Sequence, residues 1–178
     1  MKKLLAIVLA AVLLLSLVAC GGGAKFSKTI TLKYDDDEQT HYEVKLGYPD
    51  AAKLSGADMD SNCTITNEDK DYEIYAVLIA DTTYKDNKDY AKENYELFKE
   101  GKFGGFDGYS YKEGDYTYRV LVNLGATEYE NVTLYLDFDI GSAKRDLSKT
   151  AEQIFQNGDV QSIINSFEFL GKNPEEKK

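Results

Sequence analysis

The sequence contains one histidine, two cysteines and no tryptophan among its 178 residues. His41 is the only histidine, so any cysteine–histidine catalytic pair would have to use it. The motifs G-x-S-x-G, H-E-x-x-H and C-x-x-C are missing, as is a glycine loop that cradles phosphate, and no S-x-x-K follows residue 20. We therefore predict no catalytic, cofactor-binding or metal-binding residue, and expect that the protein is not an enzyme.

The first 20 residues have the pattern of an export signal. Lys2 and Lys3 precede an almost wholly apolar segment over residues 4–18, which is shorter than the roughly 20 residues of a membrane-spanning helix. A charged start, a compact apolar core and a small residue at the end, here Ala19, are typical of a secretory signal peptide. The pattern predicts that residues 1–19 are removed.

The end of this segment, Leu17-Val18-Ala19-Cys20, resembles the lipobox of bacterial lipoproteins. The resemblance implies that the thiol of Cys20 receives a diacylglyceryl group and that Cys20 becomes the first residue of the mature protein. Two acyl chains on one residue would give the stable membrane anchor that a single chain cannot provide. The alternative is an ordinary signal peptide, or an uncleaved membrane helix, in which Cys20 is incidental.

Three glycines follow Cys20, and residues 20–27 are predicted to form a short flexible tether. We expect a palmitate-labelled lipoprotein on the extracytoplasmic face of the cell membrane, with its domain close to the bilayer. The type of envelope, Gram-positive or Gram-negative, stays open.

The mature chain is strongly acidic. Without Lys2 and Lys3, its 159 residues contain 19 basic and 31 acidic side chains, and the formal charge is −12. Such a chain repels phosphate, so we expect no nucleic-acid partner. It would attract cations or cationic patches on a protein partner, although solubility alone also explains an acidic surface.

Cys63 is the only thiol left once Cys20 carries lipid, so the mature domain has no internal disulfide. Its surroundings, "SNCTITN", predict a small buried residue rather than a nucleophile.

Strands dominate the central part of the chain. Alternating apolar residues predict strands in "TITLKY" and "HYEVKL", joined by an acidic hairpin loop "DDDE" at residues 35–38. The more continuous apolar segment over residues 72–80 predicts a central strand that is covered on both faces. Further strands are predicted in "GYSY", "YTYRVLVNL" and "VTLYLDFDI".

Three helices are predicted. One begins at Asn87 and ends near Gly101, one lies in "RDLSKTAEQIFQNG", and one begins at Asp159 as its N-cap. The final "FEF" of the third segment is compatible with either helix or strand. We predict one domain over residues 28–170 and a disordered tail over residues 171–178.

This order of elements predicts an α+β fold: one domain, mainly antiparallel sheet, flanked by a few helices. It is similar to the PsbP-like fold in the early hairpin leading to Tyr48-Pro49, the helix "NKDYAKENYELFK" after a central strand, and the closing "VQSIINSFEF". That family contains binding and assembly modules, which the resemblance implies here, with an α/β/α sandwich. No functional residue of the family matches this sequence.

Two acidic motifs suggest ion chemistry. In "DMDSNCTITNED", Asp58, Asp60, Asn62 and Asp69 fall at ligand positions of an EF-hand loop, but Cys63 replaces the glycine of the turn. Asp69 is also shorter than the usual glutamate. The sequence leaves open whether the loop Asp58–Asp69 binds Ca²⁺ or is simply solvated.

Asp137 and Asp139 are predicted on the outer face of a strand, where they solubilise the sheet, bind a cation or do acid–base work. The segment Gly101–Tyr111 is interpreted as a turn with two core aromatics or as a mobile recognition loop. The tyrosines around it form either a contact patch or part of the core, and they are Tyr109, Tyr111, Tyr116 and Tyr118.

The function that follows is a lipid-anchored extracytoplasmic binding or accessory domain, of the assembly or scaffold kind. The alternatives are a small envelope enzyme that uses carboxylates such as Asp137 and Asp139, and a solute-binding or ion-binding lipoprotein. The ligand, the partner and the oligomeric state stay open.

Overall fold

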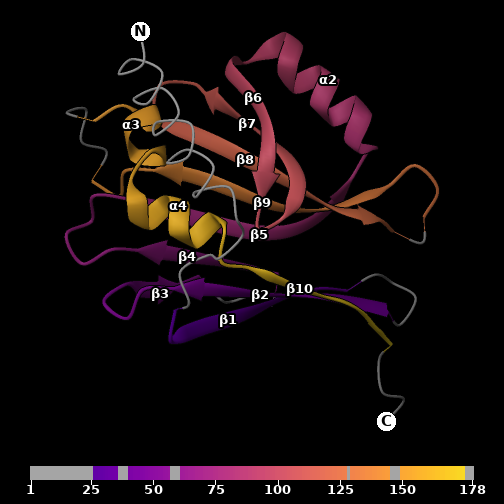
Figure 1. Cartoon of the computed structure of the whole chain (residues 1–178), viewed down its shortest axis with the longest axis horizontal. Coiled ribbons are helices and arrows are strands. Elements are labelled where there is room, and N and C mark those ends of the chain that lie inside the picture. The colour runs from indigo at the N-terminus through magenta and orange to yellow at the C-terminus, as the bar shows by residue number, and fades with distance from the viewer. Residues whose placement is uncertain (1–25, 36–39, 57–60, 128, 145–148, 175–178) are drawn as a thin grey trace, which may run out of the picture.

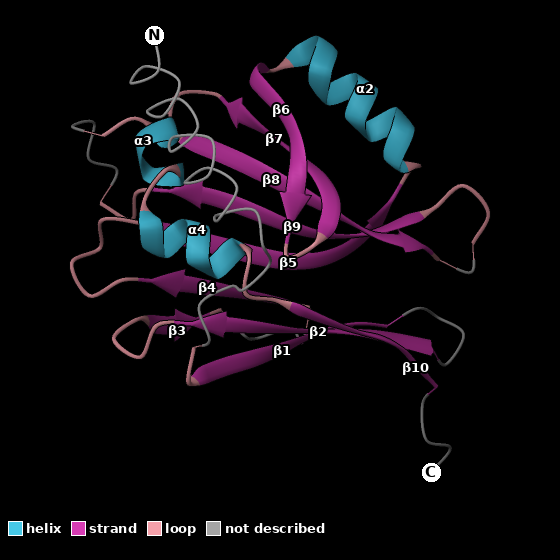
Figure 2. Cartoon of the chain, in the orientation of Figure 1, coloured by secondary structure: helices cyan, strands magenta, loops and turns pink. Residues whose placement is uncertain are grey.

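The computed structural model describes residues 26–35, 40–56, 61–127, 129–144 and 149–174. They form an α+β domain dominated by antiparallel sheet, as predicted (Figures 1 and 2). The lipobox and residues 20–25 lie outside the described residues.

The strands form two sheets, and every pair of neighbours is antiparallel. The smaller sheet has the order β1-β2-β10 and the larger one the order β3-β4-β5-β9-β8-β7-β6. Strand bounds in the small sheet are β1 Lys28–Asp35, β2 Thr40–Tyr48 and β10 Glu168–Pro174. In the large sheet they are β3 Lys53–Ser55, β4 Asn62–Thr66, β5 Glu73–Asp81, β6 Glu96–Phe103, β7 Phe106–Glu113, β8 Thr117–Ala126 and β9 Thr133–Gly141.

One face of the large sheet, here called the inner face, carries the main core. It is covered by helices α3 (Ala151–Phe155) and α4 (Gly158–Ile164) and by the small sheet (Figure 1). The ring of Phe155 stacks on that of Tyr118 at a centroid distance of 4.2 Å. The predicted alternation is confirmed, since the inward residues of β9 and β8 are buried: Leu134, Leu136, Phe138 and Ile140, with Tyr118, Val120, Val122 and Leu124.

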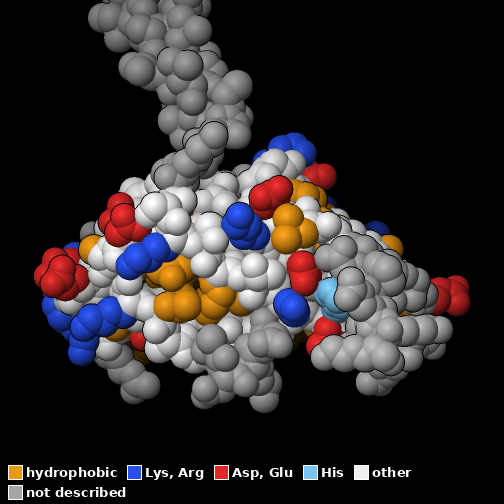
Figure 3. Space-filling view, turned by 90° about the horizontal axis from the view of Figure 1, so that it is seen from below, with side chains coloured by type: hydrophobic (Ala, Val, Ile, Leu, Met, Phe, Trp, Pro, Cys, Tyr) orange, Lys and Arg blue, Asp and Glu red, His pale blue; other side chains and the backbone are white. Residues whose placement is uncertain are grey.

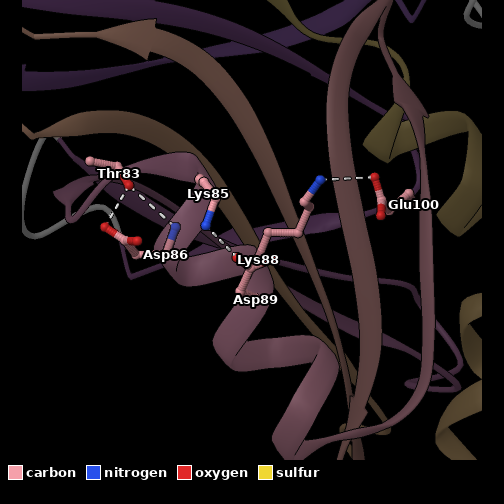
Figure 4. Close-up of polar contacts among 6 residues, drawn as sticks. All are labelled: Thr83, Lys85, Asp86, Lys88, Asp89 and Glu100. Carbon is pink, nitrogen blue, oxygen red and sulfur yellow. Dashed lines mark hydrogen bonds and ion pairs between the residues drawn. The ribbon is translucent and has the colours of Figure 1, made fainter.

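The opposite, outer face of the large sheet is partly covered by helix α2 (Tyr84–Asn94). Thr83 caps this helix, because its Oγ1 accepts a hydrogen bond from the backbone N–H of Asp86 at 3.2 Å (Figure 4). Lys88 then reaches from the helix to Glu100 of β6 at 3.1 Å (Figure 4). These contacts hold α2 across the β6 side of the sheet.

The predicted helix from Asn87 to Gly101 was wrong at both ends. The helix begins at Tyr84 and ends at Asn94, and residues 96–103 form the edge strand β6. The physical reason is tertiary: β6 pairs with β7 across a turn at Gly104 and Gly105, both of which have positive φ.

The starts of the other two helices also differ from the prediction. Helix α4 is capped by Asn157 rather than Asp159, and α3 begins at Ala151 with Thr150 as the cap of a capping box. At the C-terminus the strand interpretation of "FEF" is confirmed, and β10 continues to Pro174, where it pairs with Thr40. The predicted domain end at residue 170 and the disordered tail 171–178 were therefore wrong for residues 171–174, and residues 175–178 lie outside the described residues.

The strand that is covered on both faces is β9, not the predicted strand over residues 72–80. β9 lies in the middle of the seven strands, and its residues from Thr133 to Phe138 are all buried. β5 lies next to it, but its outward-facing Tyr75 is 37% exposed.

Candidate functional site

A cluster of charged side chains lies on the outer face of the large sheet, centred on Arg119 of β8. We call Glu113, Arg119, Asp137 and Asp139 the Arg119 network. The register brings them together, because Arg119 pairs directly with Asp139 of β9 and Glu113 ends the neighbouring strand β7. Side chains two residues apart in a strand share a face, so Asp137 lies beside Asp139.

Asp137 is the buried member of the network. Its side chain is 2% exposed, and both of its oxygens accept hydrogen bonds from Nε of Arg119, at 3.0 and 3.2 Å. Nη2 of Arg119 donates a further bond to Oδ2 at 2.5 Å. Burial raises the pKa of Asp137, and the hydrogen bonds from Arg119 oppose that shift.

The prediction that Asp137 solubilises the sheet face was therefore wrong. The strand alternation placed it correctly on the outer face, but this part of that face is covered and the carboxylate is neutralised by Arg119 instead of by water. A buried carboxylate needs such a partner because an unpaired charge away from water is very costly.

Asp139 and Glu113 are the accessible members of the network. Their side chains are 40% and 35% exposed, and they lie 3.3 and 3.6 Å from Nε and Nη1 of Arg119. The single hydrogen of Nε already points at Asp137, and the buried Oδ1 of Asp139 has no hydrogen-bond donor among the described residues. Burial first, and then the Asp137 carboxylate, raise the pKa of Asp139 to about 6.

The single guanidinium of Arg119 thus interacts with the three carboxylates of Asp137, Asp139 and Glu113. Around it, Tyr75, Asp139, Arg119 and Tyr111 form one cross-strand row over β5, β9, β8 and β7. Tyr111 is buried, and the ring of Tyr95 stacks on it at 4.4 Å, whereas Tyr75 is partly open to solvent. The arrangement leaves negative charge in excess beside an exposed aromatic ring.

A cluster of tyrosines under α2 borders the network. Tyr109 and Tyr111 are 1% and 4% exposed, and Tyr84 and Phe98 each lie 5.7 Å from the ring of Tyr109. Of the tyrosines expected as a contact patch, Tyr109, Tyr111 and Tyr118 are therefore core residues and only Tyr116 is exposed. The interpretation of Gly101–Tyr111 as a mobile recognition loop was likewise wrong. These residues belong to the β6–β7 hairpin, in which Phe103 and Phe106 pack against the core.

The EF-hand interpretation of Asp58–Asp69 is not supported by the described part of that segment. Asn62 to Thr66 form strand β4, whose pairing with β5 directs alternate side chains to opposite faces. An EF-hand requires a tight loop there. Asp58 and Asp60 lie outside the described residues, as do residues 36–38 of the acidic hairpin loop. Nowhere in the described ranges do three histidine, cysteine, aspartate or glutamate side chains group as metal ligands.

Cys63 is a fully buried core residue, as predicted, and burial raises the pKa of its thiol to about 12. His41 lies on the other sheet, where its Nε2 is 3.4 Å from Glu43. The two residues therefore form no catalytic pair.

Sequence reasoning identified Asp137 and Asp139 but missed Arg119 and Glu113. The sequence contained one indication of the role of Arg119. This residue is one of two arginines in the chain and lies in the middle of an apolar strand. Alternation places it on the face opposite to Tyr118 and Val120, where only a carboxylate on a neighbouring strand could neutralise it. The missing information was which strands are neighbours.

No family model, curated protein or solved structure matches this chain. The lipobox assignment and the resemblance to the PsbP-like fold both stay predictions. No helix within the described ranges has the length and apolar character of a membrane span.

Proposed function

We propose that this chain is a lipid-anchored, extracytoplasmic binding module of a bacterial cell envelope, and that it recognises a basic side chain of a protein partner through the Arg119 network. The anchor in this proposal is the diacylglyceryl group on Cys20. The lipobox pattern of residues 17–20 and the charge of −12 in the mature chain support it.

The observation that carries the recognition step is the charge imbalance of the network. Asp137 neutralises Arg119, so Asp139 and Glu113 remain as uncompensated carboxylates that solvent reaches. Burial first, and then repulsion by the Asp137 carboxylate, raise the pKa of Asp139 to about 6. An ammonium or guanidinium group placed beside Asp139 would relieve the repulsion and lower that pKa.

Tyr75 strengthens the preference for a cation. It is the direct cross-strand partner of Asp139, and 37% of its surface is exposed. The face of an aromatic ring attracts ammonium and guanidinium groups, and a neighbouring carboxylate adds to the attraction. A lysine or arginine side chain could therefore lie along Tyr75 with its charge at Asp139.

The test is calorimetric titration of the mature lipoprotein, in detergent, with a pentalysine peptide at low ionic strength. Asp139→Asn and Glu113→Gln should each weaken binding at least fivefold. The matched charge changes Asp69→Asn and Glu130→Gln, at exposed positions outside the network, should change it less than twofold. Binding near pH 6 should also release a proton, which disappears in Asp139→Asn. Equal weakening by all four variants would mean non-specific attraction and would exclude the network as the site.

The anchor is tested separately by labelling cells with palmitate. The wild-type chain should carry the label and remain in the membrane fraction, and Cys20→Ala should lose both. Labelling of both forms would exclude Cys20 as the acylated residue.

The alternative function is an enzyme that uses the carboxylates of Asp137 and Asp139, and only one of these two carboxylates is accessible. Asp137 is buried and paired with Arg119, so of the two carboxylates Asp137 and Asp139 a substrate could touch only Asp139. A mechanism that pairs two carboxylates would need both to reach the reacting bond, and the binding function is the one that the geometry supports best.

A further inference from the structure

The chain enters its domain through three residues that contact the end of β2 and the β2–β3 connection. The ring of Phe26 covers Gly47, where a Cβ atom would lie 2.9 Å from Cδ2 of Phe26. Ser27 donates a hydrogen bond to the carboxylate of Asp50, and Nζ of Lys28 donates one to the backbone carbonyl of Asp50 at 2.5 Å. Any tether that precedes Phe26 is therefore joined to a defined place on the domain surface.

The chain between Cys20 and Phe26 is short compared with the domain. Six residues span at most about 20 Å when fully extended. A domain of about 150 residues has a radius of gyration of about 15 Å, so it measures about 40 Å across. If Cys20 carries lipid, the entry point cannot turn to the side of the domain that faces away from the bilayer.

The surface around the entry point is suited to lipid headgroups. It combines the partly exposed aromatic rings of Phe26 and Tyr48 with Lys28 and the exposed Lys53. The carboxylate of Asp50 lies beside them and keeps its negative charge while it accepts a hydrogen bond from Ser27. Figure 3 shows the molecule from the side of the small sheet, where hydrophobic side chains gather on one part of the face with lysines or arginines nearby. Aromatic rings and lysines are the side chains that favour a membrane–water interface.

The far end of the β1–β2 hairpin is different. Asp35 pairs with His41 there, at the opposite end of the strands from the Lys28–Tyr48 pair. Helix α2 and the small sheet also lie on opposite sides of the molecule (Figure 1). In the large sheet, the row Lys53, Thr66, Glu73 and Gly141 lies at the opposite end from the β8–β9 connection, so an entry surface on the bilayer would direct that connection away from the membrane.

We propose that the entry surface, formed by Phe26, Lys28, Tyr48 and Lys53, rests on an anionic bilayer and sets the orientation of the domain. This inference rests on the lipid anchor of the proposed function, but it makes a separate claim. The short tether alone only keeps the entry point from facing away from the bilayer, whereas contact through the entry surface holds the domain in one orientation, which should depend on Lys28 and Lys53.

The experiment measures how close two sites come to the bilayer. The mature lipoprotein, in a Cys63→Ala background, receives a fluorophore at Ala51→Cys beside the entry surface or at Glu130→Cys in the β8–β9 connection, both exposed positions. The thiol of Cys20 is blocked by its lipid, so only the introduced cysteine reacts. The protein is reconstituted in vesicles of phosphatidylcholine and phosphatidylglycerol that contain a lipid with a paramagnetic headgroup.

Quenching should be at least fivefold stronger at position 51 than at position 130. Replacement of both Lys28 and Lys53 by glutamine should reduce that ratio, and circular dichroism should show that the variant remains folded. Equal quenching at both positions in protein that floats with the vesicles would overturn the orientation and leave the anchor intact. Protein that fails to float would contradict the anchor, and this inference with it.

Discussion

Strand β9 shows two kinds of interior on its two faces. Inward, Leu136 and Phe138 pack among aliphatic and aromatic side chains beneath α3, α4 and the small sheet. Outward, Tyr135 and Asp137 are equally buried, but their neighbours are tyrosines, Arg119 and the thin cover of α2. Of α2 itself only Ala91 is buried.

The difference shows how one strand is stabilised by two kinds of interaction. The inner face depends on the removal of apolar surface from water, which is roughly proportional to buried area and needs no particular partner. The outer face depends on directional partners, because each buried phenol or carboxylate must keep a hydrogen bond. The inner face should therefore respond to changes of volume, and the outer face to changes of charge and hydrogen bonding.

The largest effect should come from the inner face. Phe138→Ala removes a fully buried ring at the centre of the sheet. Loss of a large core side chain typically costs about 3–5 kcal/mol, so the free energy of unfolding should fall by that amount. Urea denaturation followed by circular dichroism measures it. A loss below about 1 kcal/mol would show that the inner face is not a close-packed core.

On the outer face, Arg119→Met should cost about 3 kcal/mol at neutral pH, because it leaves the Asp137 carboxylate buried without a partner. Adding Asp137→Leu should recover most of that loss, since an apolar pair of similar size needs no partner. Denaturation curves of the single and double variants give the comparison. A double variant as unstable as the single one would mean that Arg119 acts through packing rather than charge.

Hydrogen bonding under α2 should contribute less. Tyr135 is fully buried and its hydroxyl donates to the carbonyl of Thr82 at 3.0 Å. Tyr135→Phe keeps the ring and removes this bond, so we expect a loss of about 1 kcal/mol. Tyr116→Phe, at a residue that is 57% exposed, is the control and should have no measurable effect.

The raised pKa of Asp139, caused first by burial and then by the Asp137 carboxylate, predicts a dependence of stability on pH. The pKa of Asp139 is raised to about 6 in the folded protein, so between about pH 4 and 6 the folded state binds more protons than the unfolded state. Its contribution to stability is therefore highest at the acidic end of this window and falls as pH rises. Because the side chain is 40% exposed, the change should stay below about 1 kcal/mol. Asp139→Asn should abolish this slope in thermal unfolding from pH 4 to 7, and an unchanged slope would assign it to another group.

The smallest effect should come from the attachment of α2 to β6. Lys88→Gln removes the ion pair with Glu100, whose side chain is 53% exposed, and should cost at most about 0.5 kcal/mol. Hydrogen exchange should nevertheless become faster in α2 than in β9. Lys85→Gln, which breaks only the pair with Asp89 within the helix, serves as the matched control.

The inner face was predictable because alternation in a strand is a local property. Val120 and Val122, or Leu136 and Phe138, lie two residues apart, and any pairing of their strands would turn them to one side. The first hairpin was predictable for the same reason. The end of helix α2 at Asn94 could not be predicted, because residues 96–103 contain charges at spacings that suit a helix. Only their pairing with β7 makes them a strand.

The sequence by itself determined the fold class, the inward residues, the burial of Cys63 and the surplus of acid, since each of these follows from composition or from the period of a strand. Only the tertiary structure decided that β9 is the central strand, that tyrosines of the outer face are interior and that Arg119 meets Asp137. These depend on which strands become neighbours, and the register that places Arg119 opposite Asp139 joins segments that lie 20 residues apart in the chain. Whether a carboxylate is solvated or buried is settled by what covers it, and that is a property of the assembled sheet.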